Sequence, residues 1–230
     1  MSITAAQGFR AAGVAAGIKA SGRLDLALVV NQGPRFDAAG VFTSNRVFAA
    51  PVAWSRQAVA DGRLQAVVLN SGGANACTGR PGYQDTVATA HRVASAVGCD
   101  PEAVGVCSTG LIGVRLPMEA LLAGVDQAHL VLADAGGDDA ARAIMTTDTV
   151  PKQASVQGAG GYTIGGMAKG AGMLAPALAT MLVVLTTDAV VDSPTLQASL
   201  EQATALTFDR IRSGGCMSTI DTVLLLASGA

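Results

Sequence analysis

The sequence has 230 residues, enough for one large domain or two small ones. Hydrophobic residues make up 50% of it, charged residues only 14%, and the formal net charge is −2, which argues against nucleic acid as a partner. Aromatic residues are only 3%, so alanine, valine and leucine must fill a large core or an oligomer interface.

The N-terminal residues lack the basic segment and long apolar stretch of a secretory signal. No apolar run approaches the roughly 18 residues that a membrane span needs. We therefore expect a cytoplasmic protein without a membrane partner. Neither the cysteines nor the two histidines have the spacing of a zinc site, so no metal is predicted, and the cysteines should be small buried residues in a reducing compartment. The four cysteines are Cys77, Cys99, Cys107 and Cys216.

In the first half of the chain, strands and helices alternate. A glycine-rich opening, 8–19, is too broken for a helix. An Asn/Gly-rich loop, 70–79, could present backbone N–H groups to an anion, but it lacks a nucleotide-binding pattern, so we expect a tight structural loop. A Ser-Thr-Gly turn is expected within 107–113. Strands are predicted over 24–30, 39–43, 65–69 and 103–106, and helices over 52–60 and 83–97.

The second half continues the same mixture. A hairpin is expected over 155–165, turning at 158–161, because glycines separate two alternating segments. Pro194 is expected at the first helical position, behind Ser193. Helices are predicted over 117–132, 138–144 and 196–208, and strands over 181–185 and 222–227. Because the two types of element are interspersed, the fold class is mixed α/β.

One stretch, from Lys169 to Leu182, combines a lysine, flexible glycines, a proline and Thr180 just before an apolar strand. Thr180 can simply begin the strand, since threonine favours strands. Alternatively, its hydroxyl attacks the carbonyl of Ala179, and cleavage releases Thr180 as a new N-terminus. The freed α-amine has a reference pKa near about 8 and can act as the base for its own hydroxyl.

The stretch 169–182, KGAGMLAPALATML, resembles the cleavage motif of the ornithine acetyltransferases, the bifunctional glutamate/ornithine N-acetyltransferases of arginine biosynthesis. The resemblance extends over essentially the whole chain. Its other segments are GFRAAG at 8–13, NSGGANACTG at 70–79, CSTGLIG at 107–113 and AIMTTD at 143–148. It implies an αββα-like sandwich, with two sheets packed face to face and helices outside.

The resemblance also implies roles for individual residues. Thr180 is the cleavage nucleophile and then the acyl carrier, and Thr109 with Gly110 forms the oxyanion hole. Thr146 and Lys169 contact the amino-acid substrate, with the lysine ammonium facing its carboxylate. The implied reaction moves an acetyl group from N2-acetylornithine to glutamate through an acetyl-threonine. No cofactor is implied, although acetyl-CoA is a possible second donor.

The resemblance further implies two chains after cleavage, an α chain of residues 1–179 and a β chain beginning with 180–230, which assemble in the family as a heterotetramer of two α and two β chains. Two departures stand out. The family's β chain is longer by resemblance, and its later acidic residue and C-terminal substrate contacts have no counterpart here. Arg212, Gly214 and Ile220 also stand where the family has polar or acidic residues.

Two other functions fit the same residues. An N-terminal-threonine amidohydrolase or aminopeptidase would use Thr180 with water as the final acceptor. An inactive truncated paralogue would serve as an assembly partner. An assay with acetylornithine, with and without glutamate, separates these possibilities.

Overall fold

The computed structural model describes residues 2–172, 181–211 and 217–230. Five residues with predicted roles or predicted burial lie outside these ranges: Ala179, Thr180, Arg212, Gly214 and Cys216. The helices are α1 (Ala50–Ala58), α2 (Gly79–Val97), α3 (Met118–Leu130), α4 (Gly137–Ala143) and α5 (Ser193–Leu206). The strands are β1 (Phe9–Val14), β2 (Leu26–Asn31), β3 (Asp37–Phe42), β4 (Ala66–Gly73), β5 (Val104–Leu111), β6 (Lys152–Gln157), β7 (Thr163–Lys169), β8 (Leu182–Thr187) and β9 (Thr222–Ala227).

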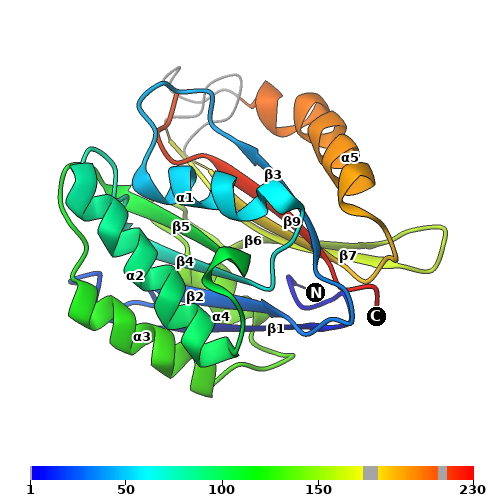
Figure 1. Cartoon of the computed structure of the whole chain (residues 1–230), viewed down its shortest axis with the longest axis horizontal. Helices are drawn as coiled ribbons and strands as arrows, with labels where there is room; N and C mark the ends of the chain where they lie inside the picture. Colours follow the sequence, from blue (N-terminus) through cyan, green and yellow to red (C-terminus); the bar gives the residue numbers. More distant parts are fainter. Residues whose placement is uncertain (1, 173–180, 212–216) are drawn as a thin grey trace.

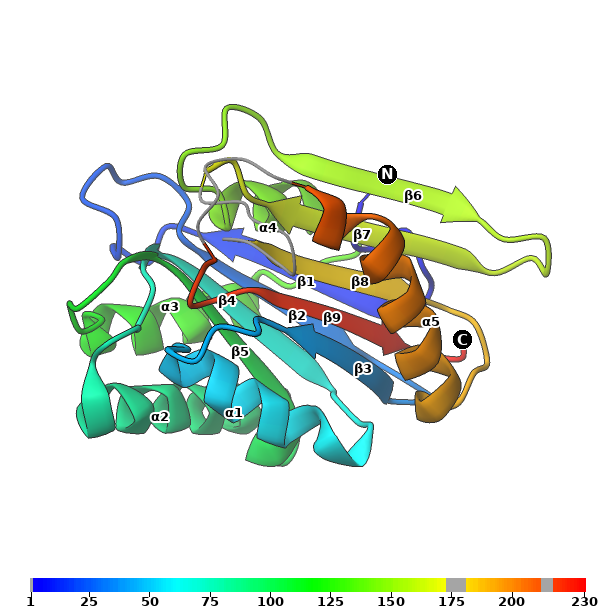
Figure 2. The same cartoon turned by 90° about the horizontal axis from the view of Figure 1, so that it is seen from above.

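The described strands form two mixed sheets (Figures 1 and 2). Sheet A has four strands in the order β1-β2-β4-β5, and sheet B has five in the order β3-β9-β8-β7-β6. Each sheet contains one parallel pair, β4 with β5 and β8 with β9, and its other neighbours are antiparallel. Parallel neighbours require a crossover, and α2 supplies the one between β4 and β5.

The two sheets pack face to face, with helices outside (Figure 1). Helices α2 and α3 cover sheet A, and α5 lies against β3 of sheet B. Side chains of β8 alternate between the two faces of sheet B: Leu182 and Val184 belong to the core between the sheets, whereas Val183 packs in the cluster under α5. The predicted αββα-like sandwich of mixed α/β class is thus confirmed.

Two helix boundaries follow from local chemistry. Helix α2 ends where Gly98 adopts φ 81°, a left-handed conformation that glycine accepts without strain. Helix α5 begins at Ser193, earlier than predicted, because the Asp192 carboxylate caps it by accepting a hydrogen bond from the Thr195 N–H at 2.9 Å. Ser193 is therefore the first helical residue and Pro194 the second.

The N-terminal strand β1 was not predicted, because its glycines obscure the strand pattern. Gly13 has a packing reason: a Cβ there would lie 2.1 Å from the Asp139 carbonyl oxygen, so only glycine lets α4 approach β1. The expectation of buried cysteines holds for Cys107 but is wrong for Cys77, which is exposed. Cys77 lies in the loop between β4 and α2, and such connections run over the surface.

Candidate active site

The Ser-Thr-Gly segment predicted as a turn is instead the end of strand β5. Thr109 is only 1% exposed. Gly110 pairs with Gly72 of β4 at a place where the register shifts. A Cβ on Gly110 would lie 2.4 Å from the backbone carbon of Gly72, and its φ is +135°, so glycine is required on both counts. Strands β4 and β5 thus approach each other closely beside Thr109, which lies in the interior.

Lys169, the last residue of β7, connects the predicted site residues. Its side chain is buried, with 1% exposure. Its Nζ donates a hydrogen bond to Thr146 Oγ1 at 2.7 Å and another to Thr109 Oγ1 at 3.2 Å. An ammonium group has donors and no acceptor, so both threonine oxygens must accept. The hydroxyl hydrogens of Thr109 and Thr146 are then directed away from the lysine and are free to donate elsewhere.

The ammonium of Lys169 is held in an environment that disfavours its charge. Burial lowers the pKa of Lys169 from the ordinary value of 10.5 to about 8. The charge of Asp148 raises this pKa in part, while the charges of Lys152 and Lys19 lower it. Burial, rather than the neighbouring charges, is therefore the main reason that the pKa of Lys169 is low.

Asp148 organises the backbone around this lysine, a role that was not predicted from the sequence. Its Oδ1 accepts hydrogen bonds from the Gly170 N–H at 2.9 Å and from Lys152 Nζ, and its Oδ2 accepts from the Thr146 N–H at 3.3 Å. Burial opposes its ionisation, but the Lys152 ammonium and these two N–H groups outweigh burial and lower the pKa of Asp148. A buried carboxylate thus fixes the positions of Thr146 and the end of β7.

A second buried carboxyl group, Asp221, lies immediately before β9. Its Oδ1 accepts a hydrogen bond from the Met181 N–H at 2.9 Å, and its Oδ2 has no hydrogen-bond partner of normal geometry among the described residues. Burial raises the pKa of Asp221 to about 7, against smaller lowering effects of Met181, Thr43 and Ser218. Its signal in the sequence is one acidic residue before an apolar strand.

The chain next to the predicted nucleophile returns beside Lys169. The described chain resumes at Met181, and Leu182 pairs with Lys169 on one side and with Thr222 on the other. Thr180 itself lies outside the described residues. Of the predicted site residues, the structure therefore brings together Thr109, Thr146 and Lys169, from three separate segments of the chain.

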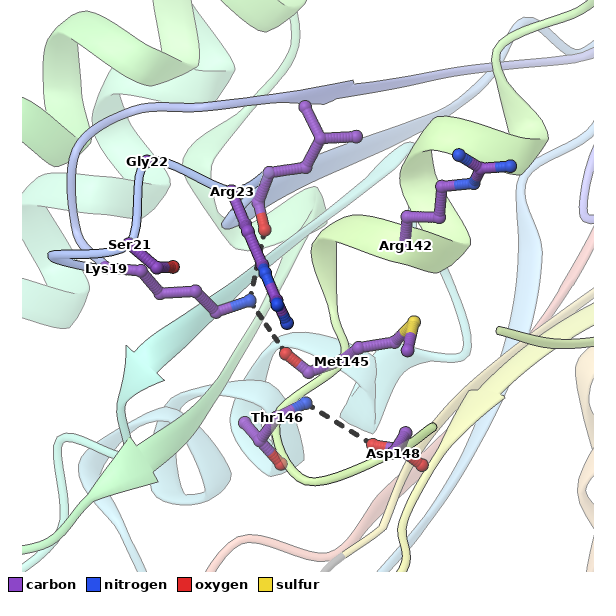
Figure 3. A pocket seen from close by; sticks show the side chains of 9 residues that line it. Lys19, Ser21, Gly22, Arg23, Arg142, Met145, Thr146 and Asp148 are labelled. Atoms are coloured by element: carbon purple, nitrogen blue, oxygen red, sulfur yellow. Dashed lines mark hydrogen bonds between the residues drawn. The ribbon is translucent and has the colours of Figure 1, made fainter. Parts of the chain in front are cut away.

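A cavity of about 530 Å³ opens beside this cluster (Figure 3). Thr146 and Asp148 contribute to its wall. The Lys19 Nζ donates to the carbonyl oxygens of Met145 at 2.7 Å and Leu24 at 3.0 Å, and so joins the loop before β2 to the segment after α4. The other lining residues are Ser21, Gly22, Arg23 and Arg142.

The segment predicted as an Asn/Gly-rich loop is partly strand, because β4 continues to Gly73 and only 74–78 connect it to α2. Asn70 donates to the Gly73 carbonyl oxygen at 3.0 Å and accepts from the Ser108 hydroxyl at 2.6 Å, which ties β4 to β5. Asn75, also buried, donates to the Gly82 carbonyl oxygen at 2.8 Å and to Thr86 Oγ1 at 2.9 Å. These bonds hold the loop against the start of α2.

Two further findings concern the described part of the chain. Within 2–172, 181–211 and 217–230, no group of three or more His, Cys, Asp or Glu side chains is arranged to hold a metal ion. Among the same residues, no helix is both long and apolar enough to cross a bilayer.

The chain is similar to known proteins over nearly its whole length. The model of the ArgJ family matches residues 10–230. The arginine biosynthesis bifunctional protein ArgJ of Streptomyces avermitilis is 65% identical over 230 residues, which cover all of this chain and 60% of that protein. The protein of the same name from Mycobacterium tuberculosis is 62% identical over 237 residues, 99% of this chain and 58% of that protein. The chain thus spans about 60% of the length of these relatives.

Solved structures agree with the sequence matches. The crystal structure of ornithine acetyltransferase from Mycobacterium tuberculosis, complexed with ornithine, matches with a TM-score of 0.75 and 61% identity, over 76% of this chain and 94% of that one. ArgJ of Bacillus halodurans matches with a TM-score of 0.69 and 37% identity, over 79% of this chain and 95% of that one. A Pyrococcus horikoshii protein that is 15% identical, with a TM-score of 0.59, shares the fold.

Proposed function

The chain belongs to the ArgJ family, and from this premise we propose that it carries the acyl-transfer site of a glutamate/ornithine N-acetyltransferase of arginine biosynthesis. The observation that carries the proposal is the junction of Thr109, Thr146 and Lys169 through the Lys169 Nζ. Three residues singled out by resemblance, far apart in the sequence, meet at one point, and the chain that follows Thr180 runs beside them.

The proposed reaction has two halves. The Thr180 Oγ attacks the acetyl carbonyl carbon of N2-acetylornithine, the C–N bond breaks, and the hydroxyl proton passes through the Thr180 α-amine to the departing nitrogen. Ornithine leaves and acetyl-Thr180 remains. The α-amino nitrogen of glutamate then attacks the ester carbonyl, the C–O bond breaks, and N-acetylglutamate leaves as Thr180 regains its proton.

Thr109 and Gly110 would stabilise the oxyanion of each tetrahedral intermediate. Lys169 supports this role, because its bond to Thr109 Oγ1 leaves the threonine hydroxyl hydrogen free to donate to a developing negative charge. The Lys169 Nζ uses two of its three hydrogens on Thr109 and Thr146. No other described residue accepts a hydrogen bond from this Nζ, so its third hydrogen would be available to the carboxylate of the amino-acid substrate.

Self-cleavage between Ala179 and Thr180 would supply the free amine. The lengths of the Mycobacterium tuberculosis and Bacillus halodurans chains favour this cleavage. Nearly all of each chain aligns with about three quarters of the present chain, and residues 1–179 make up a similar fraction of it. The two products would assemble as two α and two β chains, which native mass spectrometry would detect.

The test is to find the acetyl group on the protein. The purified chain is incubated with N2-acetylornithine, and peptide mass spectrometry looks for one added acetyl group on a peptide that begins at Thr180. Addition of glutamate should remove it and yield N-acetylglutamate, whereas water alone should remove it slowly; acetyl-CoA is tested as a second donor. If no acetyl-Thr180 forms, either in this chain or in the chain extended by the remaining residues of a relative, the proposal is wrong.

A further inference from the structure

The cavity beside the acyl-transfer site carries an excess of positive charge. Of the residues that line it, Lys19, Arg23 and Arg142 are basic and Asp148 is acidic. The Asp148 carboxylate is fully buried and already accepts hydrogen bonds from a lysine and from two backbone N–H groups. Because the whole chain has a net charge of −2, this local excess runs against its average composition.

Two of the basic groups lack a counter-ion in the part of the chain that the structure describes. Among residues 2–172, 181–211 and 217–230, neither Arg23 nor Arg142 forms a salt bridge. Burial lowers the pKa of Lys19, and the neighbouring Arg23 charge lowers it further against the opposite effect of Asp25. Like charges at one site favour a bound anion that would relieve their repulsion.

The wall that carries Arg23 is rigidly built. Asp25, which is fully buried, accepts hydrogen bonds from the backbone N–H groups of Ala16 at 2.7 Å, Ile18 at 2.7 Å and Lys19 at 2.8 Å. The loop before β2 is therefore folded around one carboxylate. Figure 3 shows the Lys19 and Arg23 side chains running toward Met145, whereas the Arg142 side chain, on α4 at the other side, extends away from them. Such preorganisation lowers the entropic cost of binding a ligand.

We propose that this cavity is a carboxylate subsite of the acyl acceptor, in which Arg23 binds the side-chain carboxylate of an acidic amino acid and Arg142 adds positive charge from the opposite wall. The inference rests on the proposed function and extends it. Thr146 lines the cavity and also accepts the hydrogen bond from Lys169, so a ligand in the cavity borders the acyl-transfer site. The volume of about 530 Å³ suits a small molecule.

The same charges would separate the two amino acids of the reaction. Arginine pairs with carboxylates through a planar fork of donors, and it repels an ammonium group. Glutamate is therefore held with its side chain in the cavity, while the side-chain ammonium of ornithine is directed elsewhere. Charge in the acceptor side chain, rather than its length, becomes the basis of selection.

The experiment compares glutamate with glutamine, its neutral analogue of equal size. Calorimetric titration of the chain, without an acetyl donor, should show glutamate binding roughly tenfold more tightly, on the scale of one charge-assisted hydrogen bond. Arg23→Gln and Arg142→Gln should each reduce this preference, and the double variant should abolish it. Arg80→Gln, a change at another exposed arginine at the start of α2, should retain it.

Several results would overturn the proposal. One is a glutamate preference that persists in the double variant, and another is equal binding of glutamate and glutamine by the unaltered chain. Titrations with coenzyme A and inorganic phosphate form the third arm: if only these respond to the arginine changes, the cavity binds phosphate and the carboxylate assignment is wrong. Acetylation of Thr180 is measured separately, so an intact glutamate preference without acetyl-Thr180 would contradict the reaction and leave the subsite standing.

Discussion

Replacing Lys169 by methionine should abolish acyl transfer and leave the fold intact at neutral pH. Methionine has a similar length and no charge, so it fills the buried space without the desolvation that Lys169 suffers. Against this gain stands the loss of two hydrogen bonds, to Thr109 and Thr146. Each is worth about 1–3 kcal/mol, so the two effects should offset one another to within about 2 kcal/mol near pH 7.

The pH dependence of the free energy of unfolding gives a more specific prediction for this variant. The folded pKa of Lys169, about 8, lies below its ordinary value of 10.5, so between these values the unfolded chain binds more protons than the folded one. The free energy of unfolding contributed by Lys169 must then rise with pH across this window. The pKa difference corresponds to about 3 kcal/mol in total.

Urea unfolding of both proteins, at about pH 8 and about pH 10.5, measures this effect. Trp54, the single tryptophan, is buried and donates to the Val104 carbonyl oxygen at 2.8 Å, so its fluorescence reports the loss of packing. Other groups titrate in the same range, but they cancel in the difference between Lys169→Met and the parent. If that difference stays constant with pH, or if the variant unfolds at neutral pH, the account of a buried, disfavoured ammonium is wrong.

Three other predictions concern neighbouring groups. Thr180→Ala should remain a single chain on denaturing gels, and cleavage that persists in the variant would refute the assignment of the nucleophile. Thr109→Ala should lower kcat by about 10²-fold with a smaller change in KM, as for other oxyanion donors; steady-state kinetics that change only KM would make Thr109 a binding contact. Asp221→Asn should raise the free energy of unfolding near pH 8 by on the order of 4 kcal/mol. The reason is that the pKa of Asp221 is raised from 3.8 to about 7, so the folded parent loses stability as the pH rises through this window. The amide oxygen still accepts from Met181, and equal urea midpoints for variant and parent at that pH would contradict this.

The presence of two buried ionisable groups, Lys169 and Asp221, is itself informative. Both are buried, and the pKa of each is displaced toward neutrality by burial. Such groups cost stability, and a chain selected for stability alone would replace them with apolar residues. Their position next to the strand that follows Thr180 is consistent with groups kept for chemistry.

Most elements of the fold were readable from local sequence. Segments with a clear apolar period, such as the helix 83–97 and the strand 222–227, were placed within a few residues of their observed bounds. Strand β1 was not, because glycines that admit α4 also erase the strand pattern. The Ser-Thr-Gly segment was placed in a turn for the same reason, since Gly110 serves a close approach between two strands.

The candidate site also has features that the sequence predicts and features that only the tertiary structure shows. The sequence by itself determined the family and singled out Thr109, Thr146 and Lys169, because a long motif can be recognised from the order of its residues alone. Only the tertiary structure decided that Lys169 is buried and bonded to both threonines, and that Asp148 holds the backbone beside it. Burial and pKa depend on which segments become neighbours. Strand β8 pairs with β9, and Lys169 bonds to Thr109, between residues remote in the chain, and no local pattern encodes such contacts.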